Sequence, residues 1–318
     1  MKTLVSRILA VLLCALALPA AVLAQAAYPN RPIELVVPYP AGGGTDVLGR
    51  GFALAATKHL PQNLIVVNKP GASGAIGWAD VINNKPEGYK VALLATDLMT
   101  QPNMGLTKIT YEDFIPIARL NYDPAAITVR ADAPWNTVEE FLAAAKKGDF
   151  RVGNGGNGST WHLAAAAVED KTGVKFNHIP FSGAAPAALA LLGGHIEAIT
   201  VSAAEVYAYT STGKLKTLAV MSEQRIKGFE KVPTLKERNI DISIGTWRGL
   251  AVAKGTPPEI VNMLRAATAK IATEQSLRDA LDRQNMGYAY ADGEAFGAVM
   301  AKDHAFYKGL ISKLGLKQ

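Results

Sequence analysis

Short runs of apolar and β-branched residues alternate with longer alanine-rich stretches along most of the chain. The short runs predict buried strands, and the alanine-rich stretches predict helices. A helix after most strands is typical of βα units built around mostly parallel sheets. The predicted strands are residues 33–38, 64–68, 90–95, 126–130, 151–153, 176–180, 196–202 and 215–221. The clearest predicted helices are residues 45–60, 137–147, 159–172, 184–192 and 257–273.

The N-terminal apolar run is preceded by two basic residues, Lys2 and Arg7. Residues 8–23 are mostly Leu, Ala and Val, and small residues follow them. This pattern predicts a cleavable export signal at residues 1–24. An uncleaved anchor is the alternative, since a membrane span needs about 20 apolar residues. Leu13 precedes the single cysteine, Cys14, which disfavours a lipoprotein signal. Removal of the signal leaves no cysteine, which excludes disulfides and thiol catalysis.

The composition fits a water-soluble globular protein of two lobes. Of the 318 residues, 49% are hydrophobic and 19% are charged, which excludes a disordered chain. The formal net charge of +6 is spread thinly, and no basic cluster exceeds two adjacent lysines, so we expect no nucleic-acid partner. The excess charge is either a solvated surface or a mild positive field that draws anions into a cleft.

Three glycine-rich turns each join an extended segment to the start of a helix. They lie at residues 38–46, 153–160 and 181–186. Glycines let the backbone approach a ligand closely, and a helix N-terminus offers unpaired N–H groups and a positive dipole end. Such places bind anions. The alternative is an ordinary βα turn, in which Thr45 or Asp46, and Ser159 or Thr160, act as helix N-caps.

Enzyme motifs are absent from the sequence. No dinucleotide fingerprint, P-loop or G-x-S-x-G nucleophile elbow occurs. The five histidines form no metal-binding pair, so we expect no catalytic residues, no cofactors and no metal. Trp161 and His162 open an alanine-rich helix, where a buried structural role is favoured over ligand contact.

Residues 28–46, which read YPNRPIELVVPYPAGGGTD, resemble the opening of the Bug (TctC-like) periplasmic binding proteins. These proteins are the solute receptors of tripartite tricarboxylate transporters. Further matching segments are residues 67–74, 86–89, 183–197, 213–216 and 246–250. The resemblance keeps its order over essentially the whole chain after the signal.

The resemblance implies a type II periplasmic binding protein fold, in which two α/β lobes joined by two crossing strands hold the ligand cleft between them. On this chain, lobe 1 would be residues 28–125 plus 250–318, and lobe 2 would be residues 126–249. The implied function is a monomer in the periplasm that captures a small carboxylate and delivers it to membrane permease subunits. The carboxylate would be a di- or tricarboxylate such as citrate, or an aromatic acid. The alternative is a sensory protein that presents its ligand to a membrane histidine kinase.

The resemblance also implies the site residues. The loop after the first strand would hold one ligand carboxylate through Ala41, Gly42, Gly43, Gly44, Thr45 and Asp46, with Asp46 expected to brace the loop rather than meet the ligand. Thr96 and Asp97 would lie at the rim of the ligand site. Lobe 2 would add Asn154, Gly158, Ser159, Thr160, Ser182, Gly183 and Ala185.

Two further segments carry implied site residues. Residues 201–205 contain Ser202 and Glu205, and this Ser-x-x-Glu form resembles the tricarboxylate-type branch, which gives citrate some weight. Arg248 would pair either with a distal ligand carboxylate or with Glu205.

Overall fold

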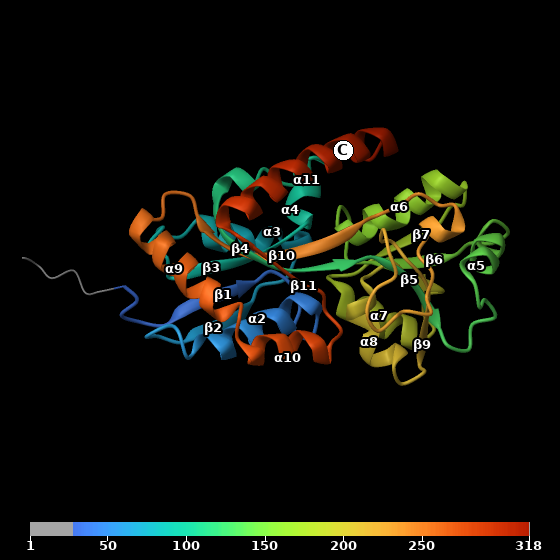
Figure 1. Ribbon diagram of the computed structural model, residues 1–318. Helices are drawn as coiled ribbons and strands as arrows, with labels where there is room; N and C mark the ends of the chain where they lie inside the picture. Colours follow the sequence, from blue (N-terminus) through green and yellow to red (C-terminus); the bar gives the residue numbers. More distant parts are fainter. Residues whose placement is uncertain (1–27, 318) are drawn as a thin grey trace, which may run out of the picture.

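The computed structural model describes residues 28–317, and the predicted export signal lies outside them. Two β-sheets stand side by side, each covered by helices (Figure 1). The six-stranded sheet has the order β11-β4-β10-β3-β1-β2. Its strands are β1 (Ile33–Val37), β2 (Leu64–Asn68), β3 (Lys90–Ala95), β4 (Phe114–Pro124), β10 (Gly245–Ala253) and β11 (Tyr288–Asp292). β1 pairs in parallel with β2 and β3, whereas β10 is antiparallel to β3 and β4.

The five-stranded sheet has the order β7-β6-β8-β5-β9. Its strands are β5 (Ala126–Arg130), β6 (Arg151–Asn154), β7 (Asn177–Pro180), β8 (Ala198–Ile199) and β9 (Leu215–Val220). The parallel strands β7, β6 and β8 end at one edge of this sheet, where the glycine-rich turns follow β6 and β7.

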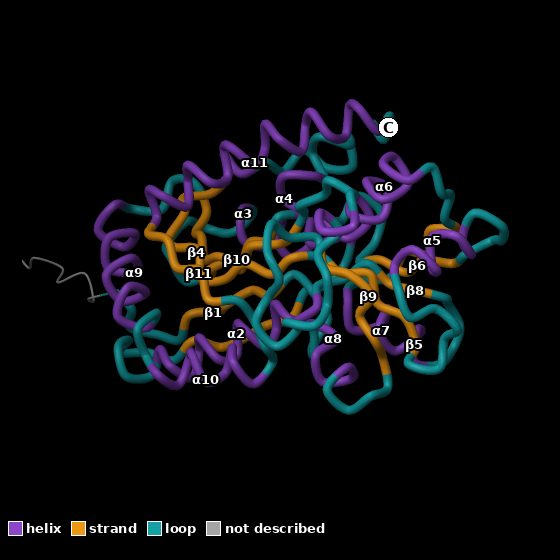
Figure 2. The backbone as a smooth tube through the Cα atoms, turned by 45° about the vertical axis from the view of Figure 1, so that its right-hand side comes forward, coloured by secondary structure: helices purple, strands orange, loops and turns teal. Residues whose placement is uncertain are grey.

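Helices flank both sheets and lie outside the strands in the tube view (Figure 2). Around the six-stranded sheet lie α2 (Gly44–Ala56), α3 (Ala75–Ile82), α4 (Asp97–Thr100), α9 (Pro258–Ile271), α10 (Gln275–Arg283) and α11 (Gly293–Leu314). Around the five-stranded sheet lie α5 (Val138–Ala145), α6 (Thr160–Thr172), α7 (Ala184–Leu192) and α8 (Ala203–Thr210). None of the helices within residues 28–317 is long and apolar enough to cross a membrane.

Each sheet has its own hydrophobic core. On one face of the six-stranded sheet, Leu35 and Leu48 pack with apolar residues of α9 and α10. On its other face, Trp78 and Trp247 pack with Phe296 of α11. The five-stranded sheet buries a separate cluster around Phe141. Separate cores explain how two lobes keep their shape while a cleft lies between them.

The chain crosses between the sheets twice. β4 continues through Ala125 directly into β5, and the segment after β9 returns to begin β10. Ala125 ties the two crossings together, because its N–H donates to Ile244 O at 2.8 Å and its carbonyl accepts from Met221 N at 2.7 Å. Residues 245–249 pair with β4, so the second crossing enters the six-stranded sheet at Gly245.

Candidate functional site

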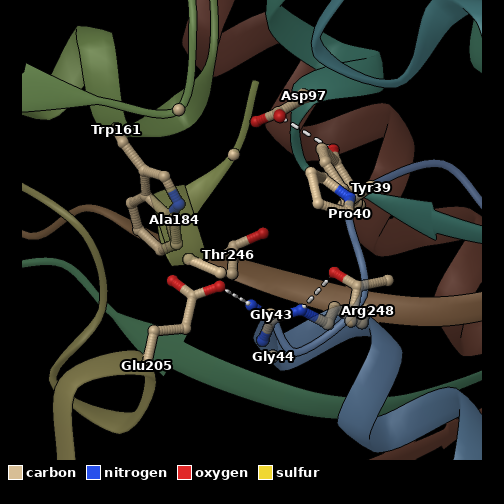
Figure 3. A pocket seen from close by; sticks show the side chains of 15 residues that line it. Tyr39, Pro40, Gly43, Gly44, Asp97, Trp161, Ala184, Glu205, Thr246 and Arg248 are labelled. Carbon is tan, nitrogen blue, oxygen red and sulfur yellow. Dashed lines mark hydrogen bonds and ion pairs between the residues drawn. The ribbon is translucent and has the colours of Figure 1, made fainter. Parts of the chain in front are cut away.

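A small cavity lies between the two lobes and is lined by residues of both (Figure 3). Its volume is about 30 Å³, which holds two or three water molecules at roughly 10–15 Å³ each. The lining residues are Tyr39, Pro40, Gly43, Gly44, Thr45, Ala95, Asp97, Gly155, Trp161, Gly183, Ala184, Ala185, Glu205, Thr246 and Arg248. The lobes are therefore closed on the site in this structure, and they must move apart to admit a carboxylate of more than a few atoms.

Two helices, one from each lobe, begin at the cavity wall. α2 begins at Gly44 and α7 at Ala184, and no side chain caps either helix. The first N–H groups of a helix have no acceptor within it, so Gly44, Thr45, Ala184 and Ala185 offer backbone donors at the cavity. The positive dipole ends of the two helices add to the attraction of these donors for an anion. This arrangement can hold a carboxylate between the lobes.

A buried ion cluster forms another part of the wall. The Arg248 guanidinium donates from Nη1 to Asp123 Oδ2 at 2.6 Å, from Nη2 to Glu205 Oε1 at 2.9 Å and from Nε to Thr45 Oγ1 at 2.9 Å. Arg248 is paired with Glu205 in this structure, which is one of its two predicted roles. A Cβ on Gly44 would lie 2.8 Å from Arg248 Nη2, so the loop passes tightly against this cluster.

Burial and pairing set the charge of the cluster. Burial lowers the pKa of Arg248, but Glu205 and Asp123 outweigh burial and leave the pKa above its ordinary value. Burial raises the pKa of Glu205 above its ordinary value; Arg248 lowers it, the charge of Asp123 adds to the increase, and the hydrogen bonds from Ser202 oppose it. Ser202 N, Ser202 Oγ and Arg248 Nη2 each donate a hydrogen bond to the Glu205 carboxylate, which accepts all three and so suits its ionised form.

Asp97 joins the lobes on the far side of the cavity. Its Oδ2 accepts from the Tyr39 hydroxyl at 2.7 Å, and its Oδ1 accepts from both the N–H and the hydroxyl of Thr160 at 2.7 Å. Thr160 is the first residue of α6, so a carboxylate of one lobe caps a helix of the other. Gln101 Nε2 also donates to Asn157 O, at 3.2 Å, across the lobes. Burial leaves the pKa of Asp97 above its ordinary value, because it outweighs the hydrogen bonds from Thr160 and Tyr39 that lower the pKa.

The structure places eight of the predicted site residues in the cavity wall. They are Gly43, Gly44, Thr45, Asp97, Gly183, Ala185, Glu205 and Arg248. Ala41 and Gly42 are exposed in the turn before α2. Asp46 braces that turn, because Oδ2 accepts from Gly42 N at 3.0 Å and from Arg50 Nε at 2.9 Å.

The other predicted site residues lie behind or beside the wall. Thr96 accepts from Trp247 N at 3.0 Å, and Asn154 Oδ1 accepts from Gly156 N at 2.9 Å. The remaining five cap helices, join the lobes or face solvent: Ser159 caps α6, Thr160 binds Asp97, Gly158 packs against the other lobe, Ser182 is exposed, and Ser202 caps α8.

Sequence reasoning missed several lining residues. They are Tyr39, Pro40, Ala95, Gly155, Trp161, Ala184 and Thr246. Trp161 was expected to be structural; it is 7% exposed, and its ring points into the cavity (Figure 3). Its place at the start of a helix after a glycine-rich turn was the available signal. His162 is structural, because Nδ1 accepts from Gly158 N at 3.2 Å and burial lowers its pKa to about 4.

No group of three or more His, Cys, Asp or Glu side chains within residues 28–317 could hold a metal ion. The groups that line the site are backbone amides, hydroxyls, an indole and one ion cluster. Without a nucleophile paired to a base, this set favours binding over covalent chemistry.

A cavity closed between two α/β lobes, with a helix from each lobe beginning at its wall, defines a two-lobe solute-binding protein. The chain belongs to the tripartite tricarboxylate transporter receptor (TctC) family, whose model matches residues 48–316. The predicted family, the two-lobe fold and the expectation that the protein is not an enzyme are thereby confirmed.

Relatives cover nearly the whole chain. The UPF0065 protein in the gbd 5′ region of Cupriavidus necator is 36% identical over 91% of this chain and 89% of that protein. A crystal structure of a TctC solute-binding protein from Polaromonas, without ligand, is 94% identical, covers 90% of this chain and 99% of that one, and has a TM-score of 0.68. The structure of the periplasmic binding protein BugD is 29% identical, covers 91% of this chain and 99% of that one, and has a TM-score of 0.87.

Two more distant solved structures share the fold. Rpa4515 of R. palustris with adipate is 23% identical, covers 91% of this chain and 98% of that one, and has a TM-score of 0.85. MatC of Rhodopseudomonas palustris with bound malate is 24% identical, covers 89% of this chain and 100% of that one, and has a TM-score of 0.83.

Proposed function

We propose that this protein captures a small carboxylate in the cavity between its lobes and delivers it to the permease of a tripartite tricarboxylate transporter. In this proposal the chain is exported to the periplasm by the signal at residues 1–24. One observation carries the proposal: the uncapped N-termini of α2 and α7 meet the same cavity from opposite lobes. A carboxylate bound there bridges the lobes and stabilises their closed arrangement.

The known ligands of the fold neighbours support this ligand class. Adipate in Rpa4515 and malate in MatC are both small carboxylates. The family description, a receptor of a tripartite tricarboxylate transporter, supports delivery to a permease.

The comparison with the Polaromonas protein supports a movement of the lobes. At 94% identity, its ligand-free structure has a TM-score of 0.68, whereas BugD reaches 0.87 at 29% identity. Chains so similar in sequence keep the same lobe folds, so the lower score favours a different arrangement of the lobes. Closure around a captured ligand accounts for such a difference.

Gly43→Val tests the proposal in the loop before α2. Gly43 has φ −79° and ψ 166°, which valine adopts without strain, and only Pro40 O, at 3.6 Å, would contact the added Cβ. We expect the variant to fold normally and to lose most carboxylate binding, because its side chain fills the place where a carboxylate meets the amides. Gly309→Val on the exposed side of α11 is the control, since nothing lies within 4 Å of it.

Thermal shift and calorimetry against a panel of mono-, di- and tricarboxylates would measure binding. A ligand at 100 times its Kd raises the free energy of unfolding by about 2.7 kcal/mol, which such a screen detects. If no carboxylate binds the wild-type protein, or if the folded Gly43→Val variant binds normally, the proposed site is wrong.

A further inference from the structure

The charged groups around the cavity are mainly acidic. Asp97 and Glu205 line it, and Asp123 is bonded to Arg248, the one cation among the described lining residues. With all three carboxylates ionised, they and the one guanidinium carry a formal charge of −2, which is the most negative value because burial raises the pKa of Asp97 and of Glu205. Asp46 adds nothing to this count because Arg50 neutralises it at 2.9 Å. This balance disfavours a polyanion, because every negative charge of the ligand would have to be met by backbone amides alone.

The one cation is already engaged. Arg248 is 2% exposed and is bonded to Asp123, Glu205 and Thr45 together. A second ligand carboxylate at Arg248 would have to displace Glu205 or lie against its charge. The Ser-x-x-Glu segment therefore places a negative group in the cavity wall, where its charge repels a second ligand carboxylate.

The rest of the wall offers one place for an anion and one for a donor. The amides at the starts of α2 and α7 form the place for an anion. Glu205 Oε1 accepts one hydrogen bond, from Arg248, and a carboxylate oxygen can accept a second. The Glu205 carboxylate and the Trp161 ring point into the same space (Figure 3).

From this charge distribution we infer that the ligand has a single carboxylate, held by the α2 and α7 amides, and a neutral or cationic hydrogen-bond donor that pairs with Glu205. The inference rests on the proposed function and narrows it: the protein discriminates against citrate and other polycarboxylates. Glu205 is the residue that sets this specificity, since its charge opposes a second carboxylate and its free lone pair accepts from a donor.

Matched pairs of dicarboxylic acids and their monoamides test the inference. The pairs are malonate with malonamate, succinate with succinamate, and glutarate with glutaramate, and citrate completes the panel. Each monoamide has nearly the size and shape of its diacid but replaces one carboxylate by a neutral group with two N–H donors. Calorimetry on the full mature chain should show at least one monoamide binding tenfold more tightly than its diacid and than citrate.

Glu205→Gln should reduce that preference or reverse it, because the amide keeps the shape and removes the negative charge. Glu197→Gln is the matched control, since Glu197 pairs with Arg151 outside the cavity lining. If the diacids or citrate bind more tightly than every monoamide, the inference is wrong while the proposed function stands. If no member of this panel and no other carboxylate binds, both are wrong.

Discussion

Arg248 holds together the buried ion cluster in the cavity wall. It holds two buried carboxylates, Asp123 and Glu205, whose side chains are 2% and 7% exposed. Replacing both partners of a buried ion pair by apolar groups can be neutral, but removing one partner leaves a buried charge without compensation. The stability of the protein should therefore respond strongly to this side chain.

Arg248→Met should lower the free energy of unfolding by about 3–5 kcal/mol, the usual cost of breaking a buried ion pair. Adding Glu205→Gln to it should recover part of the loss, because one of the two stranded charges is then removed. Urea denaturation would measure both variants. Arg130→Met, which breaks the exposed pair with Asp132, is the control and should change stability little. Equal stability of Arg248→Met and wild type would show that the cluster is not essential to the fold.

The cavity residues could be predicted from sequence only where the backbone has a recognisable function. The glycine-rich turns point to Gly44, where a Cβ would lie 2.8 Å from Arg248 Nη2, and to Gly183, which has φ +157°. Gly43 has φ −79° and no close contact, so it was predicted only because it lies in the same run of glycines. Trp161 and Tyr39 carry no such record, since an aromatic residue beside a strand or helix end equally suits a core. Whether Arg248 meets a ligand or Glu205 depends on a contact between residues 43 positions apart, which periodicity does not encode.

At the scale of elements, α8 is held by a capping box that also positions a cavity residue. Ser202 Oγ accepts from Glu205 N at 3.3 Å and donates to Glu205 Oε2 at 3.0 Å. An equivalent box starts α5, where Thr137 and Glu140 face solvent. Each box caps the N-terminus of its helix, but only the box of α8 lies at the cavity.

Ser202→Ala and Thr137→Ala should each cost about 1 kcal/mol of stability, the usual value of a lost N-cap. Only Ser202→Ala should weaken ligand binding several-fold, because Glu205 then loses one of the contacts that fix its orientation. Urea denaturation and calorimetry on both variants separate the two effects. Ligand affinity unchanged in Ser202→Ala would show that the cap does not hold Glu205 for binding.

Strand prediction succeeded where apolar runs are continuous and failed where they are interrupted. All eight predicted strands have a counterpart, although β8 is only Ala198–Ile199 because Ser202 already caps α8. β4, β10 and β11 were missed. β4 reads FIPIARLNYDP, in which two prolines and the polar residues Arg119, Asn121 and Asp123 break the β-branched pattern. In β10, polar Thr246 and Arg248 are buried because they form the floor of the site.

At the scale of the whole molecule, closure depends on contacts that exist only when the lobes meet. Asp97 accepts two hydrogen bonds from Thr160 of the opposite lobe, and hydrogen bonds to a charged group contribute roughly 1.5–3 kcal/mol each. Ser73 Oγ and Gln101 Nε2 add contacts to Asn157 O, each at 3.2 Å. Gly158, with φ +73°, permits this approach, since a Cβ there would lie 2.5 Å from Leu106.

Asp97→Asn should shift the protein toward the open arrangement, because an amide replaces the ionised acceptor that caps α6 across the lobes. Solution scattering should show the wild type contracting when ligand is added. At the same ligand concentration, the variant should keep a larger radius of gyration and bind more weakly. Asp132→Asn is the control, since it makes the same change in an exposed pair. If Asp97→Asn contracts and binds as the wild type does, closure is driven by the ligand alone, and the contact between Asp97 and Thr160 only accompanies it.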